Sequence, residues 1–260
     1  MSVSLDRNTR RWWTLLRGVS VLNVALWAWV AWSVDLSRPY VSAHLALSAV
    51  YTLVCGFRSF YPRVDLERLV LVDHWLSSMV LGRSAATIAE MAFTAQLTLL
   101  LFELSPQLSW LYPLGVASFV VIAVAQVTCW LGVLTGNHLW HAAEESLWGL
   151  MVAGMAAAGV GLWPEAGSAL RGVIALGWVG CAGAIGVMWG LDVPMYLRRW
   201  REHGAGGARG VREGFVDALH RREPSGAWSV WRHEIWWMTP YFSFGVWLSL
   251  ALAGLRPPLS

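Results

Sequence analysis

The sequence predicts an all-α integral membrane protein, a polytopic bundle of about seven transmembrane helices that forms one domain over residues 1–260. Of its residues, 57% are hydrophobic and only 13% are charged, about half of the roughly 25% charge that soluble domains carry. Apolar runs of about 20 residues, the length a helix needs to cross a bilayer, recur along the whole chain. The basic residues gather in the connections on one side of these runs.

Seven segments have the length and apolar character of spans. The first has a basic start but no small-residue cleavage site after it, so we expect a retained helix rather than a signal peptide. A break at Gly136–Asn137 separates the fourth span from the fifth. In chain order the expected spans are Trp12–Val34, Tyr40–Phe57, Arg83–Leu104, Leu111–Leu134, His138–Leu162, Leu170–Leu197 and Trp236–Leu255.

Two connecting segments carry features of their own. Residues 69–82 are too short to span, so we expect an interfacial or re-entrant helix there. The alternative is that this segment merges with the third span into one long tilted helix. Residues 201–228 form a basic, glycine-rich cytoplasmic loop with a short amphipathic piece at Val211–Arg222. We interpret the loop as a link held at anionic lipid headgroups, with a lid over a pocket as the alternative.

Arginine sets the expected orientation, because all 19 basic residues are Arg and 16 of them fall on one side of the seven spans. The positive-inside rule then predicts a cytoplasmic N-terminus in the cell inner membrane. The net charge of +3 indicates anionic headgroups rather than nucleic acid as the partner. Without lysine the chain cannot hold retinal as a Schiff base, and three cysteines without CxxC spacing predict no disulfide framework.

Ionisable residues inside spans are costly, about 2.5–3.5 kcal/mol each on insertion scales, so each is a candidate functional residue. Several lie at one depth, in the cytoplasmic half of their spans. His141 shares a helical face with His138, Glu145 and Trp148. We therefore predict a pocket with catalytic residues Glu90, His141, Glu144, Glu145 and Asp192.

Tryptophan gives a second signal, with 19 copies in the chain. Some lie inside spans beside the polar faces, where aromatic rings stabilise a cation by roughly 0.5–2 kcal/mol when it is desolvated. This combination suits protonation of an alkene or epoxide and shielding of the carbocation that results. The expected substrate-binding residues are Trp130, Trp148, Trp189, Trp237 and Tyr241.

Each of these residues also has a simpler interpretation. Glu90 can be the ion-pair partner of Arg83, and Asp192 can accompany a kink at Pro194, which leaves a backbone carbonyl unpaired. A glutamate near the start of the fifth span can interact with the helix dipole. Tryptophan also packs well in helix bundles. The coincidence of several groups at one depth, rather than any one motif, favours a functional site.

The leading hypothesis is a membrane-embedded enzyme, of isomerase or cyclase type, that acts on an isoprenoid- or sterol-like lipid by acid–base chemistry without a cofactor. Its arrangement is similar to that of small membrane isomerases and cyclases of sterol and terpene pathways, which use buried acids among aromatics. The similarity is one of chemistry and carries no residues over.

Three other hypotheses stay open. The first is a Zn- or Fe-dependent lipid hydrolase or oxygenase with His138, His141 and Glu145 as ligands. The second is a proton-coupled transporter, although the inverted repeat and broken helices of that class are absent from the sequence. The third is an assembly subunit of a larger membrane complex. Substrate identity, reaction direction and oligomeric state do not follow from the sequence.

Overall fold

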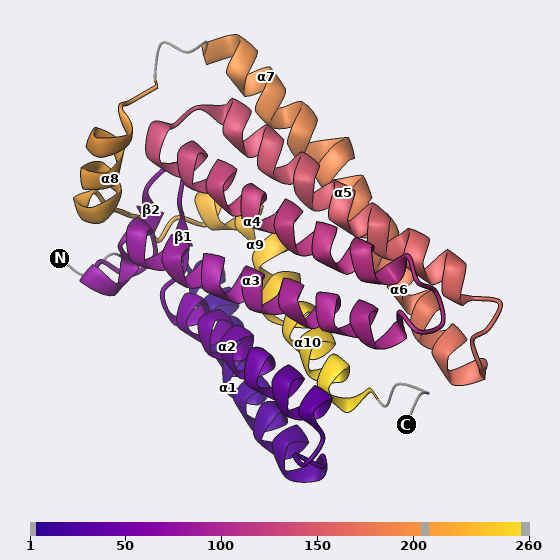
Figure 1. Cartoon of the computed structure of the whole chain (residues 1–260). Coiled ribbons are helices and arrows are strands. Elements are labelled where there is room, and N and C mark those ends of the chain that lie inside the picture. Colours follow the sequence, from indigo (N-terminus) through magenta and orange to yellow (C-terminus); the bar gives the residue numbers. More distant parts are fainter. Residues whose placement is uncertain (1–3, 204–207, 256–260) are drawn as a thin grey trace. The chain divides into compact units, whose positions relative to one another are not determined.

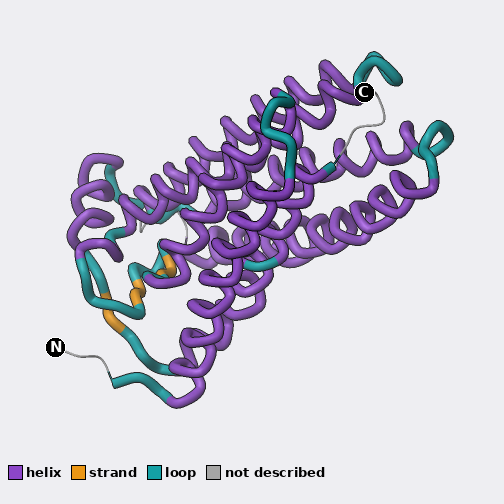
Figure 2. The backbone as a smooth tube through the Cα atoms, turned by 90° about the horizontal axis from the view of Figure 1, so that it is seen from below, coloured by secondary structure: helices purple, strands orange, loops and turns teal. Residues whose placement is uncertain are grey.

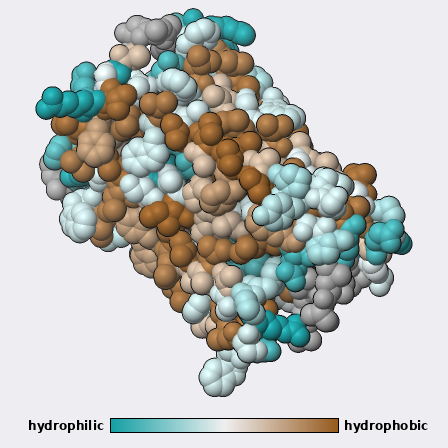
Figure 3. Space-filling model, in the orientation of Figure 1, coloured by the Kyte–Doolittle hydropathy of each residue, from teal (hydrophilic) through white to brown (hydrophobic). Residues whose placement is uncertain are grey.

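The computed structural model, which describes residues 4–203 and 208–255, is 80% helical, and this confirms the all-α class. Within these residues, six helices are long and apolar enough to cross a membrane, consistent with a bundle of about seven (Figure 1). The helices are α1 (Arg7–Ser33), α2 (Pro39–Phe60), α3 (Met79–Leu104), α4 (Leu111–Thr135), α5 (His138–Leu162), α6 (Ser168–Val187), α7 (Val193–His203), α8 (Val211–His220), α9 (Trp228–Phe242) and α10 (Phe244–Gly254). Apolar side chains cover broad areas of the visible surface, as a lipid-facing protein requires (Figure 3).

The expected seventh span is the pair α9 and α10, which is interrupted at Ser243. Pro240 lies inside α9 and has no backbone N–H to continue the helical ladder. The Ser243 N–H turns back to the carbonyls of Thr239 and Pro240, at 3.1 and 3.3 Å. The expected seventh span is therefore two consecutive helices rather than one unbroken helix.

The chain divides into two compact units. The first comprises Met1–Gln96 and Phe215–Ser260, and the second comprises Leu97–Gly214. The first boundary falls inside α3 and the second inside α8. The residues proposed from sequence as one site are thus shared between two units.

In the first unit, α2 packs against α1 and α10. Aromatic side chains dominate the core of this unit, where Trp12 stacks on Trp231 with 5.7 Å between ring centroids. Both indoles are almost fully buried, and each still donates its N–H. The acceptor for Trp12 is the Thr239 hydroxyl at 3.1 Å, and for Trp231 the Ser225 carbonyl at 2.7 Å. These bonds satisfy the polar edge of each buried ring.

Residues 69–82 do not form the interfacial helix expected from sequence. The segment contains a two-residue strand β2 (Leu69–Val70) and a 3-10 turn η1 (Trp75–Ser77), and α3 begins only at Met79. β2 pairs with β1 (Arg63–Val64) and with β3 (Glu223–Pro224) (Figure 2). This ladder and the burial of Val70 and Leu71 hold the segment extended, so its last four residues alone join the third span.

In the second unit, α4 lies along α5, and α5 also packs against α6 and α7. Its core joins Leu101, Leu104 and Leu111 to Ala158 and Leu162. Between α6 and α7 the helix widens into a π-helical turn η2 (Met188–Asp192). Pro194 follows two residues later and lacks the N–H that an α-helical ladder needs. The sixth expected span is therefore one helical run in which the hydrogen bonding changes to the π pattern over Met188–Asp192.

Candidate functional site in the second unit

The site is built on a tight hairpin between α4 and α5. Gly136 ends α4 in the left-handed region with φ 71°, a conformation that glycine adopts without a steric penalty. Asn137 then caps α5, because its side-chain oxygen accepts from the Leu139 N–H at 3.0 Å. With only two linking residues, the last turns of α4 face the first turns of α5.

Three reactive side chains meet across this hairpin: Cys129 from α4, and His141 and Glu144 from α5. All three are buried, and one potential ligand atom from each lies within 4.8 Å of the others. His141 Nδ1 is 3.0 Å from Glu144 Oε2. The second ring nitrogen, His141 Nε2, is buried and has no hydrogen-bond partner among the described residues.

The imidazole is fixed on both sides. On one side, α4 passes so closely that a Cβ placed on Gly132 would lie 2.6 Å from His141 Nε2. On another, the Tyr196 ring stacks on the imidazole with 5.2 Å between centroids and an angle of 27°. A side chain confined in this way has one orientation available to it.

This geometry gives the two ring nitrogens different roles. An ionised carboxylate only accepts hydrogen bonds, so an ionised Glu144 would hold a proton on Nδ1 and leave Nε2 as the acceptor. A carboxylate hydrogen-bonded to one ring nitrogen orients histidine for proton transfer at the other nitrogen. The arrangement therefore supports acid–base chemistry at Nε2.

Two further predicted residues lie in the same unit but outside this cluster. Glu145 is half-buried on the adjacent face of α5, and Asp192 is half-buried at the end of the π-helical turn. The placement of Asp192 just before Pro194 agrees with its interpretation as a residue at a helix irregularity. A catalytic role for these two residues stays a prediction.

Glu90 lies in the first unit, where it is buried and engaged on both oxygens. Its Oε2 accepts from Arg83 at 2.7 Å, and its Oε1 accepts from the Tyr241 hydroxyl at 3.3 Å. These contacts are those expected of Glu90 as the ion-pair partner of Arg83. A catalytic role for Glu90 and a pocket shared with His141 stay predictions.

The expected aromatic walls also divide between the units. Trp189 donates its indole N–H to the Ser146 carbonyl at 3.3 Å, and this bond joins η2 to α5. Trp130 and Trp148 are half-buried on α4 and α5. Trp237, in the first unit, donates to Glu234 at 2.6 Å and meets Tyr241 edge to face.

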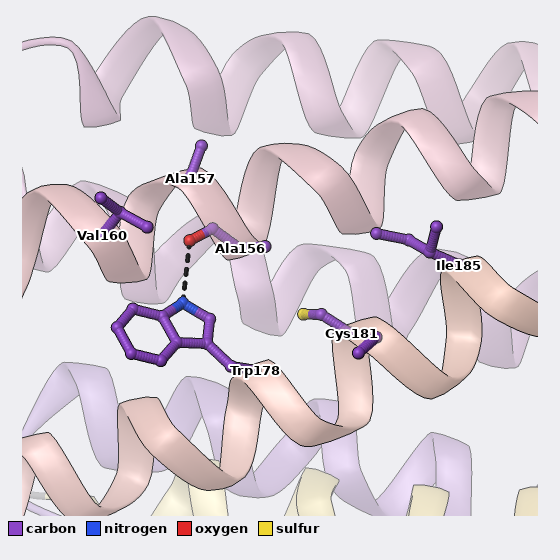
Figure 4. A pocket seen from close by; sticks show the side chains of 7 residues that line it. Ala156, Ala157, Val160, Trp178, Cys181 and Ile185 are labelled. Atoms are coloured by element: carbon purple, nitrogen blue, oxygen red, sulfur yellow. Dashed lines mark hydrogen bonds between the residues drawn. The ribbon is translucent and has the colours of Figure 1, made fainter.

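An open apolar groove of about 450 Å³ runs between α5 and α6. The Trp178 N–H donates to the Ala156 carbonyl across it at 3.0 Å, so the indole forms one end (Figure 4). The lining residues are Ala156, Ala157, Val160, Trp178, Cys181, Ala182 and Ile185. These side chains carry no charge, so the groove suits an apolar chain and not the reacting centre.

The metal set expected from sequence was His138, His141 and Glu145. Among the described residues, the group whose ligand atoms lie close together is instead Cys129, His141 and Glu144. Cys129 was not among the ligands expected from sequence, because the cysteines show no CxxC spacing. The sequence could have indicated Cys129, because a two-residue turn at 136–137 folds residues near 130 onto residues near 141.

Comparisons with protein-family models, with curated proteins and with solved structures found no match for this chain.

Proposed function

We propose that this chain is a membrane-embedded enzyme that acts on a hydrophobic, isoprenoid- or sterol-like lipid by acid–base chemistry of the isomerase or cyclase type. The observation that carries the proposal is the buried His141–Glu144 pair, with 3.0 Å between Nδ1 and Oε2 and an unpartnered Nε2. A histidine with one nitrogen oriented and the other free is the usual arrangement for proton transfer.

In this scheme His141 Nε2 accepts a proton from a C–H of the lipid that is allylic and also next to a carbonyl, which takes up the electron pair as an enolate, and returns the proton to another carbon of the same molecule. One C–H bond breaks and one forms while the double bond moves, so the reaction needs no oxidant and no cofactor. The transient imidazolium lies between the Glu144 carboxylate and the face of Tyr196. Both neighbours favour the positive charge, the aromatic face by roughly 0.5–2 kcal/mol.

The lipid nature of the substrate is supported by the setting of the site. The pair lies on α5, one of six helices with the length and apolarity of a membrane span. The apolar groove between α5 and α6 is open, and such a surface accommodates an isoprenoid or acyl chain. We place the enzyme in the cell inner membrane with its N-terminus in the cytoplasm, because the arginines lie mainly on that side.

The test compares the lipids of host cells that express wild type, His141→Ala or His220→Ala. His220 is exposed at the end of α8 and serves as the matched histidine control. We expect one isoprenoid or sterol-like lipid to be converted by wild type and by His220→Ala but not by His141→Ala, with all three proteins present at equal levels. Identical lipid profiles for wild type and His141→Ala refute the assignment.

A second candidate function is a metal-dependent lipid hydrolase or oxygenase, and the position of Cys129 favours it. Zinc bonds of about 2.0–2.3 Å place tetrahedral ligand atoms roughly 3.3–3.8 Å apart. The three groups here lie within 4.8 Å, so a small contraction suffices. Cys129, His141 and Glu144 would hold the ion and leave one position open, where the metal would act as a Lewis acid.

Metal analysis of the purified protein separates the two candidates. The acid–base proposal predicts no bound Zn or Fe and a Cys129→Ala variant that still converts the lipid. About one equivalent of metal in wild type, lost in Cys129→Ala together with activity, would replace that proposal with the metal-dependent one.

A further inference from the structure

Four arginines are buried in the first unit: Arg58, Arg63, Arg68 and Arg83. Two of them are neutralised by carboxylates. Arg68 Nε lies 2.9 Å from Asp217 Oδ2, and Arg83 Nη2 lies 2.7 Å from Glu90 Oε2. A buried guanidinium without a partner is unfavourable, so the other two require a separate account.

Arg63, in β1, is only 1% exposed. Its Nη1 donates to the carbonyls of Ser78 at 2.8 Å and Leu76 at 3.4 Å, and its guanidinium lies 5.0 Å from the centroid of Phe57. Its Nε and Nη2 are buried without a hydrogen-bond partner among the described residues. Asp65 attracts Arg63, but none of the ion pairs of the described residues joins the two.

Arg58 lies in the last turn of α2 and is 6% exposed. Its guanidinium lies 5.8 Å from the centroid of Trp237 and 5.5 Å from that of Phe242. Among the described residues it forms these aromatic contacts but no hydrogen bond or ion pair. Five N–H donors of one charged group therefore have no acceptor in the part of the chain that the structure describes.

The two groups also act on each other. The pKa of Arg63 is lowered to about 10, mainly by burial; Asp65 opposes this shift, and the charge of Arg58 adds to it. Like charges in a poorly hydrated site repel, and an anion that contacts Arg58 relieves the repulsion. The C-terminal dipole of α2 also favours Arg58, but it supplies no acceptor for the guanidinium outside the helix.

Phosphate is the anion that fits this place. α2 ends at Phe60, only two residues beyond Arg58, so the guanidinium lies at the level where an apolar span reaches lipid headgroups. The planar guanidinium matches phosphate oxygens in a bidentate manner. We propose that Arg58, assisted by the charge of Arg63, binds a single phosphate group at the end of α2.

The proposal is independent of the function assigned to His141, and it predicts the sign of a stability change. In detergent free of phosphate, Arg58→Met should melt at or above the temperature of wild type, because methionine removes an uncompensated buried charge and keeps the apolar stem. Arg17→Met is the matched control. It removes a half-buried arginine of the same unit that also lies over a tryptophan, with 4.1 Å to the Trp13 centroid.

The experiment measures thermal unfolding and native mass spectra with phosphatidylglycerol, inorganic phosphate or diacylglycerol added. We expect phosphatidylglycerol to raise the melting temperature of wild type and Arg17→Met by several degrees, since ligand at about 100 times Kd raises the folded-to-unfolded ratio about a hundredfold. Arg58→Met should lose this response and bind at least about tenfold more weakly.

Two outcomes support the site and differ in the source of the phosphate. A response to phosphatidylglycerol alone assigns the site to a lipid headgroup, and an equal response to inorganic phosphate assigns it to a free anion. If Arg58→Met does not fold, Arg58→Lys replaces it, and the expected loss of affinity is partial. An equal response to diacylglycerol, or one that the Arg58 variants do not alter, overturns the proposal.

Discussion

Gly132→Ala tests whether α4 confines the imidazole of His141. The added Cβ would lie 2.6 Å from Nε2 and 2.8 Å from both Cδ2 and Cε1, whereas ordinary contacts begin at about 3.4 Å. The ring or the helix must therefore move by close to 1 Å. Overpacking of this kind costs typically 1–3 kcal/mol, and a misplacement of about 1 Å at a reacting group costs about 100-fold in rate.

The control is Gly186→Ala on α6, where an added Cβ meets nothing within 4 Å. Both changes gain the same helix propensity, so their difference isolates the clash. We expect Gly132→Ala to melt below Gly186→Ala by roughly 2–12 °C in detergent, at about 2–4 °C per kcal/mol for a chain of this size. Equal melting temperatures, together with equal conversion of the lipid, would show that His141 is not held against α4 and would refute the reasoning.

Two other variants test the separation of structural from reactive residues. Glu90→Gln leaves the buried Arg83 without its carboxylate, so we expect the free energy of unfolding to fall by about 3–5 kcal/mol. The double variant Arg83→Met/Glu90→Leu removes both charges and should recover much of this loss. Chemical denaturation measures both variants, and an unchanged midpoint for Glu90→Gln would argue against the ion pair. Asn137→Ala removes the cap of α5 and should lower the free energy of unfolding by about 1 kcal/mol. Chemical denaturation measures this change as well, and an unchanged free energy of unfolding would mean that water replaces the cap at this hairpin.

The helical bundle was predictable because hydrophobic length alone defines spans. The fifth span begins and ends at the expected residues, His138 and Leu162, since a left-handed glycine and a capping asparagine mark its start. The break at Ser243 within the last expected span was not predictable, because the sequence is apolar on both sides of it. Apolar composition does not report where a backbone hydrogen bond is missing.

The candidate site was predictable only in part. Helical spacing grouped His141 with Glu145, yet the structure pairs His141 with Glu144, three residues along. Which face of α5 is buried depends on where α4 packs against it. The helical period of α5 alone does not give that position. Cys129 escaped notice for the same reason, since its importance arises from its contact across the hairpin.

The position of the proton on His141 decides whether the His141–Glu144 pair is arranged for proton transfer at Nε2. Solid-state NMR of ¹⁵N-histidine-labelled protein, with His141→Asn to assign the signal among seven histidines, reports which ring nitrogen carries the proton. We expect the proton on Nδ1, held by Glu144, and a bare Nε2, with the signal altered in Glu144→Gln. A proton on Nε2, or a His141 signal that does not respond to Glu144→Gln, would contradict the proposed role of the pair.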